Sequence, residues 1–126
     1  MGRLDGKVAI ITGAARGQGE CEARLFAKEG AQVVLGDILD AEGEAVAKDI
    51  GEAATYAHLD VRSEEDWSNA VAAAQTFGPL TVLVNNAAIT HFASVVDTTL
   101  EDYNRVISIN QVGTFLGLRA VFHPMK

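Results

Sequence analysis

The sequence has a single cysteine, Cys21, only two prolines, and few aromatic residues, which make up 6% of the chain. One cysteine excludes an internal disulfide framework and suits a protein from a reducing compartment. Basic residues are also scarce, because ten lysines and arginines are scattered among 17 acids, giving a formal net charge of −7 and a pI near 4.8. This balance argues against nucleic acid or an anionic membrane surface as a partner.

Long hydrophobic runs and internal linkers are also lacking. No run approaches the roughly 18 apolar residues of a membrane span, and residues 1–7 lack the apolar centre of a signal peptide. We therefore expect a cytoplasmic protein. Because no repeat, low-complexity segment or flexible linker divides the sequence, residues 1–126 are expected to form one domain.

Short apolar runs alternate with helical patterns along the chain. Runs of valine, isoleucine and leucine without polar alternation are typical of strands that are buried on both faces of a parallel sheet. Strand followed by helix through four rounds implies helices on both faces of that sheet. The pattern predicts an α/β fold, a Rossmann-type doubly wound parallel sheet of about four strands. Strands are expected at residues 8–11, 31–36, 54–59 and 80–84, and helices at 21–29, 41–50, 63–77, 99–109 and 111–122.

Two of the expected helices carry start signals in the sequence. Ser63, followed by acids as far as Asp66, has the pattern of a capping box, and Thr99 with Asp102 repeats it. The acids after Ser63 are better explained by this helix start than by acid–base catalysis.

Three glycines follow the first expected strand directly, at positions 13, 17 and 19. Glycine lets a backbone turn sharply and approach a ligand, and the start of the following helix favours an anion such as a pyrophosphate. Alone, this spacing would equally suit a tight turn. Asp37, which ends the second expected strand, makes it more specific, since an acid about 20 residues after such glycines binds the ribose in nucleotide-binding βαβ units.

Five motifs follow one another along the chain: Thr12-Gly13-x-x-x-Gly17-x-Gly19, Asp37, Asp60-Val61, Asn85-Asn86-Ala87 and Asn110. Together they resemble the short-chain dehydrogenase/reductase family over essentially all 126 residues. Within it, residues 36–40 and 115–121 are most similar to bacterial hydroxysteroid dehydrogenases of the 3α/20β type. The resemblance implies an NAD(H)-dependent oxidoreductase that transfers hydride between the nicotinamide and a secondary alcohol or ketone, with hydroxysteroids as a candidate substrate class.

The resemblance also implies roles for individual residues. Asp37 would bind both hydroxyls of the adenosine ribose and repel a 2′-phosphate, which favours NAD over NADP, although Arg16 could hold such a phosphate. Asn110 would be the catalytic asparagine that orders a helix kink and a proton-relay water. The cofactor-binding residues would be Gly13, Arg16, Gly17, Gln18 and Gly19 at the pyrophosphate and adenosine ribose, Asp37 and Ile38 at that ribose, Asp60 and Val61 at the adenine, and Asn86, Ala87 and Ala88 at the nicotinamide ribose.

The sequence departs from the family pattern in two ways. Gln18 stands where an apolar residue is usual, and Ala88 stands where glycine is usual. The family's catalytic serine and Tyr-x-x-x-Lys pair are not found, since Tyr56 and Tyr103 are followed four residues later by Asp60 and Ile107. We therefore expect residues 1–126 to be the NAD-binding Rossmann domain, the amino-terminal part of a larger short-chain dehydrogenase domain, and to hold a cofactor but be inactive alone.

Other features leave alternatives open. The second hypothesis is that the chain is a non-catalytic nucleotide-binding or assembly module. The family resemblance implies a homo-oligomer, either a dimer or a tetramer, formed through the helix at 112–122. We expect the apolar stripe of this helix to lack a partner within the chain. His58, His91 and His123 show no metal-ligand spacing, so no metal site is expected. His91, in the loop after the paired asparagines, would either border the substrate or lie on the surface.

Overall fold

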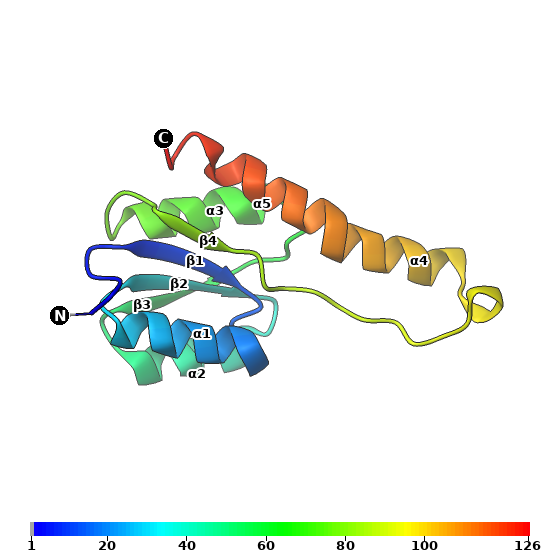
Figure 1. Cartoon of the computed structure of the whole chain (residues 1–126), viewed down its shortest axis with the longest axis horizontal. Coiled ribbons are helices and arrows are strands. Elements are labelled where there is room, and N and C mark those ends of the chain that lie inside the picture. Colours follow the sequence, from blue (N-terminus) through cyan, green and yellow to red (C-terminus); the bar gives the residue numbers. More distant parts are fainter. Residues whose placement is uncertain (1) are drawn as a thin grey trace.

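The protein is described here by a computed structural model covering residues 2–126. Four parallel strands form one sheet in the order β3-β2-β1-β4, which confirms the predicted Rossmann-type α/β fold (Figure 1). The chain builds outward from β1 to β3 and then crosses to the other side of β1 for β4. The strands are β1 (Val8–Thr12), β2 (Gln32–Asp37), β3 (Ala54–His58) and β4 (Val82–Val84).

Strand β1 lies at the centre of the hydrophobic core. Successive side chains of a strand point to opposite faces, so Ile10 packs into one apolar cluster and Ile11 into the other. Helices α1 (Gly17–Lys28) and α2 (Asp40–Ile50) cover one face, whereas α3 (Glu64–Gln75) and α5 (Gly113–Phe122) cover the other. Because helices cover both faces of β1, its side chains are buried on both sides, which explains the unbroken apolar run.

The first helix starts earlier than the sequence pattern predicts, at Gly17 instead of Cys21. Arg16 before it is extended, with φ −162° and ψ 176°, and the positive φ of Gly17, 59°, turns the chain into the helix. The hydrophobic pattern could not show this start, because the first turn carries no apolar side chain. Gly30, with φ 99°, follows the end of the helix as expected.

The start of α3 corrects one prediction. Ser63 Oγ accepts a hydrogen bond from the Asp66 N–H at 3.1 Å, as a cap should. The Asp66 carboxylate does not return to Ser63, as a capping box requires, but accepts from the Asp60 N–H at 2.9 Å. Thr99 caps the next helix as predicted, by accepting from the Asp102 N–H.

The two predicted carboxyl-terminal helices form one continuous helical rod. Helix α4 (Leu100–Ile107) passes through a π-helical turn, η2 (Ser108–Val112), directly into α5. The predicted apolar stripe at residues 112–122 was expected to lack a partner, and for one face of the helix this is wrong, because Leu116 and Val121 are buried against the core. The opposite face stays exposed, with Val112, Phe115, Leu118 and Phe122 on it.

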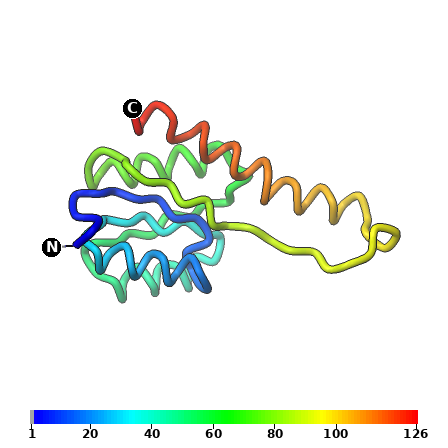
Figure 2. The backbone as a smooth tube through the Cα atoms, in the orientation of Figure 1, coloured from blue at the N-terminus to red at the C-terminus, as the bar shows by residue number. Residues whose placement is uncertain are grey.

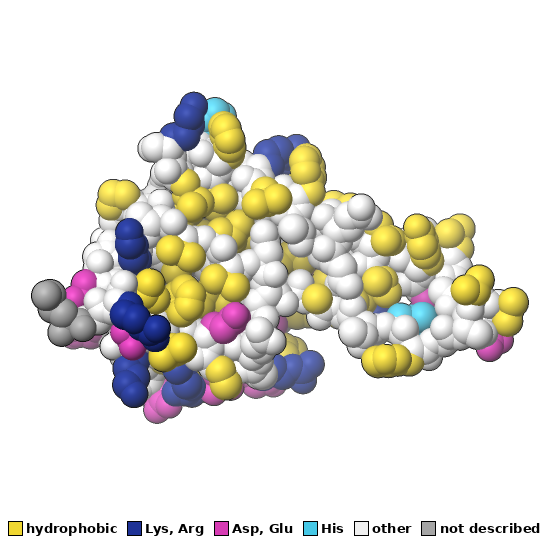
Figure 3. Space-filling view, in the orientation of Figure 1, with side chains coloured by type: hydrophobic (Ala, Val, Ile, Leu, Met, Phe, Trp, Pro, Cys, Tyr) yellow, Lys and Arg dark blue, Asp and Glu magenta, His cyan; other side chains and the backbone are white. Residues whose placement is uncertain are grey.

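The segment after β4 and helix α4 project from the body of the molecule (Figures 1 and 2). The short helix η1 (Val95–Asp97) lies at the tip, where Phe92, Val95 and Val96 are at least 90% exposed. Figure 3 shows hydrophobic side chains gathered on this projection. Within residues 2–126, no helix combines the length and apolar character needed to cross a bilayer.

Candidate functional site

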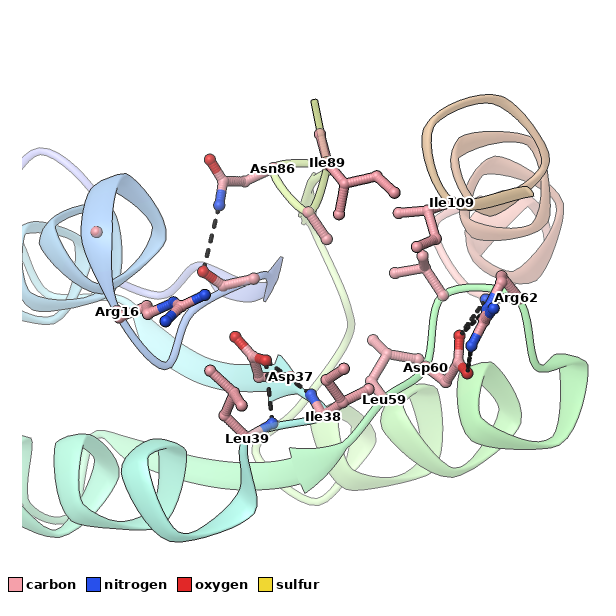
Figure 4. Close-up of a pocket in the computed structure, with 15 residues that line it drawn as sticks. Arg16, Asp37, Ile38, Leu39, Leu59, Asp60, Arg62, Asn86, Ile89 and Ile109 are labelled. Carbon is pink, nitrogen blue, oxygen red and sulfur yellow. Dashed lines mark hydrogen bonds and ion pairs between the residues drawn. The ribbon is translucent and has the colours of Figure 1, made fainter. Parts of the chain in front are cut away.

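A cleft of about 360 Å³ opens at the carboxyl ends of the strands (Figure 4). In an open parallel sheet, a crevice forms where consecutive connections leave a strand in opposite directions, and here β1 is that point because β2 and β4 flank it. The structure brings ten of the predicted cofactor-binding residues together around this cleft. They are Gly13, Arg16, Gly17, Asp37, Ile38, Asp60, Val61, Asn86, Ala87 and Ala88.

Five further lining residues were missed by the sequence analysis, and two predicted ones are not among the lining. Each missed residue lies one or two positions from a predicted one, so only the fold shows that its side chain reaches the cleft. The missed residues are Leu39, Leu59, Arg62, Ile89 and Ile109; the predicted cofactor-binding residues outside the lining are Gln18 and Gly19.

The three glycines after β1 serve different purposes. A Cβ on Gly19 would stand 2.1 Å from the carbonyl oxygen of Gly13, so only glycine lets α1 pack this closely on the turn. Gly13, with φ 68°, adopts a left-handed conformation and would also press a Cβ against Asn86. A Cβ on Gly17 would meet nothing within 4 Å, so the backbone at this position is open to a ligand.

Thr12 and Asn86 fasten the glycine turn to the end of β4, an arrangement called the Thr12–Asn86 clamp below. The Thr12 hydroxyl oxygen accepts hydrogen bonds from the N–H groups of Asn86 at 3.0 Å and Ala87 at 2.9 Å. In return, Asn86 Nδ2 donates to the carbonyl oxygens of Thr12 at 3.0 Å and Gly13 at 3.3 Å. The clamp holds two walls of the cleft together, and the sequence analysis did not foresee it.

Asp37 presents a fixed carboxylate at the end of β2. Its Oδ2 accepts from the Ala15 N–H at 3.0 Å, and its Oδ1 accepts from the N–H groups of Ile38 at 2.7 Å and Leu39 at 3.1 Å. These bonds tie the acid to the glycine turn on one side and to the start of α2 on the other. Figure 4 shows the carboxylate between Arg16 and Leu39, facing the cleft.

Asp60, at the end of β3, is bound by Arg62. The guanidinium donates from Nη2 to Oδ2 at 2.7 Å and from Nε to Oδ1 at 2.9 Å, and the Arg62 side-chain hydrogen bonds are the largest cause that lowers the pKa of Asp60. The carboxylate predicted to accept from an adenine is therefore shared with a guanidinium. Next to it, the indole N–H of the buried Trp67 donates to the Val61 carbonyl at 2.9 Å and fixes that part of the wall.

Asn110 lies in the π-helical turn and outside the cleft lining, with its side chain directed at Ile89. Its Oδ1 accepts from the Ile89 N–H at 2.9 Å, and its Nδ2 donates to the Ile89 carbonyl at 2.7 Å. This pair of bonds holds the strand-like segment after β4 against the helical rod. Since Ile89 lines the cleft, Asn110 influences the cleft by positioning the Ile89 backbone. The predicted catalytic role of Asn110 stays a prediction.

The cleft has the chemistry of a binding site. Among the described residues that line it, no side chain is serine, tyrosine, lysine or histidine. Tyr56 lies outside the lining, and burial, with a hydrogen bond to Asp40, raises its pKa so that its hydroxyl stays protonated. What this chain offers is a glycine turn for an anion and a carboxylate for hydroxyl groups.

Comparisons with known proteins decide the family. A family model described as short chain dehydrogenase matches residues 7–126. The chain belongs to the short-chain dehydrogenase family. This confirms the family that the glycine turn and the strand-end motifs predicted.

Individual members of the short-chain dehydrogenase family are similar along nearly the whole chain. A 3-alpha-(or 20-beta)-hydroxysteroid dehydrogenase of Mycobacterium tuberculosis is 51% identical over 126 residues, covering 99% of this chain and 48% of the relative. This similarity bears out the expected likeness to bacterial hydroxysteroid dehydrogenases. A trans-4-hydroxycyclohexanecarboxylate dehydrogenase of Sinomonas cyclohexanicum is 43% identical, covering 98% of this chain and 52% of the relative.

A solved structure agrees with the same fold. The crystal structure of a 3-ketoacyl-(acyl-carrier-protein) reductase from Brucella melitensis complexed with NADH matches with a TM-score of 0.92 and 42% sequence identity. The match covers 95% of this short-chain dehydrogenase chain and 50% of the reductase chain. The chain therefore spans about half the length of the relatives it matches.

Proposed function

We propose that this chain forms the NAD(H)-binding part of a short-chain oxidoreductase that interconverts a secondary alcohol and a ketone. The observation that carries the proposal is the Asp37 carboxylate, which three backbone N–H groups fix at the edge of a cleft opposite an open glycine turn. A carboxylate at the end of the second strand is the group that binds ribose hydroxyls in nucleotide-binding βαβ units. The NADH complex of the Brucella melitensis reductase supports this reading.

The residues present fit a dinucleotide. The backbone at Gly17 is open, and the first N–H groups of α1 with the positive end of its dipole favour the pyrophosphate. Asp37 would hold the adenosine ribose, and Val61 with Leu59 would flank the adenine from the end of β3. Asn86 and the small residues after it would support the second ribose at the end of β4, with Gln18 and Gly19 contributing backbone at the turn.

The fixed acid favours NAD over NADP. A 2′-phosphate on the adenosine ribose would meet the Asp37 carboxylate at close range, and two negative charges in a partly desolvated site repel each other. Arg16 lines the same part of the cleft and works in the opposite direction. We give the carboxylate more weight because three hydrogen bonds fix it, whereas Arg16 is exposed and free to swing away.

In this proposal, different groups transfer the hydride and the proton. The bound nicotinamide would supply or accept the hydride. The chain orients it through the Thr12–Asn86 clamp, and Asn110 holds the Ile89 backbone at the rim. Among the described lining residues there is no serine, tyrosine, lysine or histidine, and the family resemblance implies that a serine and a Tyr-x-x-x-Lys pair exchange the proton.

We also propose a substrate class and an assembly to test. The relative from Mycobacterium tuberculosis is named a hydroxysteroid dehydrogenase, so a hydroxysteroid is the first substrate class to test. The exposed apolar face of α5, with Phe115, Leu118 and Phe122, suits the homo-oligomer that the family implies. The cytoplasmic location stays a prediction.

Cofactor binding tests the proposal most directly. In the whole protein that carries this sequence, calorimetry should find tighter binding of NADH than of NADPH. Replacing Asp37 by asparagine removes the charge and keeps an acceptor oxygen, so NADH should bind about tenfold more weakly, as expected for losing a charge-assisted hydrogen bond. NADPH binding should weaken less or improve.

The matched control is Asp97→Asn, at the tip of the projection and away from the cleft. It should leave both affinities unchanged, and thermal unfolding should show that both variants are folded. Equal NADH affinity in the wild type and Asp37→Asn would contradict the proposed site. Tight NADH binding with no oxidation by any ketone would favour a non-catalytic nucleotide-binding or assembly module.

A further inference from the structure

A chain of hydrogen bonds and ion pairs lies behind the adenosine side of the cleft. His58, the last residue of β3, places its Nδ1 2.7 Å from Asp40 Oδ1 at the start of α2. Its Nε2 lies 3.7 Å from Asp66 Oδ2 in the first turn of α3. The imidazole thus stands between two helix starts. We call Tyr56, Asp40, His58 and Asp66 the His58 network.

Both ends of the His58 network reach the backbone of cleft residues. At one end, the Tyr56 hydroxyl lies 2.6 Å from Asp40 Oδ1 and 2.5 Å from the carbonyl oxygen of Asp37, two acceptors between which its proton is shared. At the other end, Asp66 Oδ2 accepts from the Asp60 N–H at 2.9 Å. The network therefore connects the two strand ends that carry the proposed ribose and adenine acids.

Acidic groups from three parts of the fold face the His58 ring. They are Asp40 from α2, Asp66 from α3 and Asp60 from the loop between β3 and α3, while Tyr56 on the same strand stays neutral. The hydrogen bond to Asp40 raises the pKa of His58 above its ordinary 6.5, and the charges of the three acids add to this. His58 is accordingly the member of the network whose charge changes near neutral pH.

The protonation state decides whether the ring connects both helices. Imidazolium has two N–H donors, so it can hold Asp40 with one nitrogen and attract Asp66 with the other. Neutral imidazole has one donor, and the shorter contact keeps it at Asp40. Loss of the proton then releases the Asp66 side of the bridge.

We propose that His58 is a positioning residue for the adenosine end of the cofactor, whose imidazolium joins the starts of α2 and α3 and so fixes the strand ends that carry Asp37 and Asp60. This rests on the proposed NAD(H) function. By linkage, if the protonated bridge favours the cofactor, the bound cofactor favours the proton to the same extent. NADH should bind more tightly below the pKa of His58 and more weakly as pH rises through it. Because half of the His58 side chain is exposed, we expect an effect of about two- to fivefold.

The proton can be observed directly, without relying on cofactor binding. Nuclear magnetic resonance titration of the histidine ring protons in the whole protein should place the pKa of His58 above that of an unstructured histidine. Asp66→Asn keeps an acceptor oxygen for the Asp60 N–H and should lower the pKa of His58. Saturating NADH should raise it.

Binding supplies the second measurement. The affinity for NADH, measured from about pH 6 to about pH 9 across the titration range of histidine, should fall with rising pH in the wild type. His58→Gln keeps a hydrogen-bond donor without the charge and should flatten this dependence. His123→Gln, beyond the end of α5 and away from the cleft, is the matched control and should keep the wild-type profile.

Different results would overturn the two proposals separately. A His58 pKa that NADH does not move, or an unchanged pH profile in a folded His58→Gln variant, sinks the positioning role and leaves the NAD(H) site standing. Failure of wild-type protein to bind NADH at any of these pH values removes the proposed function and this inference together.

Discussion

Replacing Thr12 by valine tests the Thr12–Asn86 clamp with almost no change of shape. Thr12 is fully buried at the end of β1, and its hydroxyl oxygen accepts from two backbone N–H groups at 3.0 and 2.9 Å. Valine fills the same space but has no acceptor. The N–H groups of Asn86 and Ala87 would then lose this partner at the point where β4 enters the cleft.

The expected cost follows from these two bonds. An unsatisfied buried donor costs about 1–3 kcal/mol, and the lower end applies to the partly buried Ala87 N–H, which loses its acceptor. The Asn86 N–H keeps the Val84 carbonyl oxygen at 3.0 Å and loses only its second hydrogen bond, worth about 0.5–1.5 kcal/mol. The added methyl group returns roughly 0.8 kcal/mol of hydrophobic burial. We expect Thr12→Val to lower the free energy of unfolding by about 1 kcal/mol and to weaken NADH binding as well, since the clamp positions the nicotinamide side of the cleft.

Urea unfolding of the whole protein, followed by circular dichroism, measures the first effect, and calorimetry with NADH measures the second. Thr12→Ser keeps the hydroxyl and should retain most of both. Thr76→Val removes an exposed hydroxyl at the end of α3 and should change neither. If Thr12→Val unfolds at the same urea concentration as the wild type with the same slope, the clamp does not stabilise the fold.

Three further changes test other parts of the site. Gly19→Ala places a methyl group 2.1 Å from the Gly13 carbonyl oxygen, so thermal unfolding should show a loss of about 1–3 kcal/mol from overpacking, and an unchanged melting temperature would contradict it. Trp67, the sole tryptophan of these 126 residues, donates to the Val61 carbonyl in the adenine wall, so NADH should change its fluorescence; a Trp67 signal unaffected by saturating NADH would place the cofactor elsewhere. Asn110→Leu removes both bonds to the Ile89 backbone and should lower kcat/KM of the whole enzyme at least tenfold, an order of magnitude expected for a misplaced cleft wall, whereas full activity would leave Asn110 a structural residue only.

The sequence was sufficient for the fold class because each local signal agreed with the next. The apolar runs of β1 and β2 could be buried only between two layers of helices, and glycines or caps marked several helix ends. The same signals placed Gly13, Asp37, Asp60 and Asn86 at strand ends, and the carboxyl ends of parallel strands meet at one edge. Their gathering around one cleft was therefore predictable.

The local sequence pattern did not predict the hydrogen-bond partner of a polar group that had more than one possible partner. Asp66 reads as half of a capping box, yet it binds the Asp60 N–H, which the fold brings close. Asp60 reads as a free acceptor, yet Arg62 binds it. One helix boundary failed as well, because the sequence predicts two helices that meet at Asn110, whereas a π-helical turn continues the helix through this position.

By itself, the sequence determined the parallel α/β architecture, the glycine turn and the acid at the end of β2, because strand burial, glycine conformation and motif spacing are properties of the chain over a few neighbouring residues. Only the tertiary structure decided what those residues bind to. The Thr12–Asn86 clamp spans 74 positions, and the His58 network joins two helix starts to two strand ends. Such contacts depend on the strand order β3-β2-β1-β4, which no short stretch of sequence specifies.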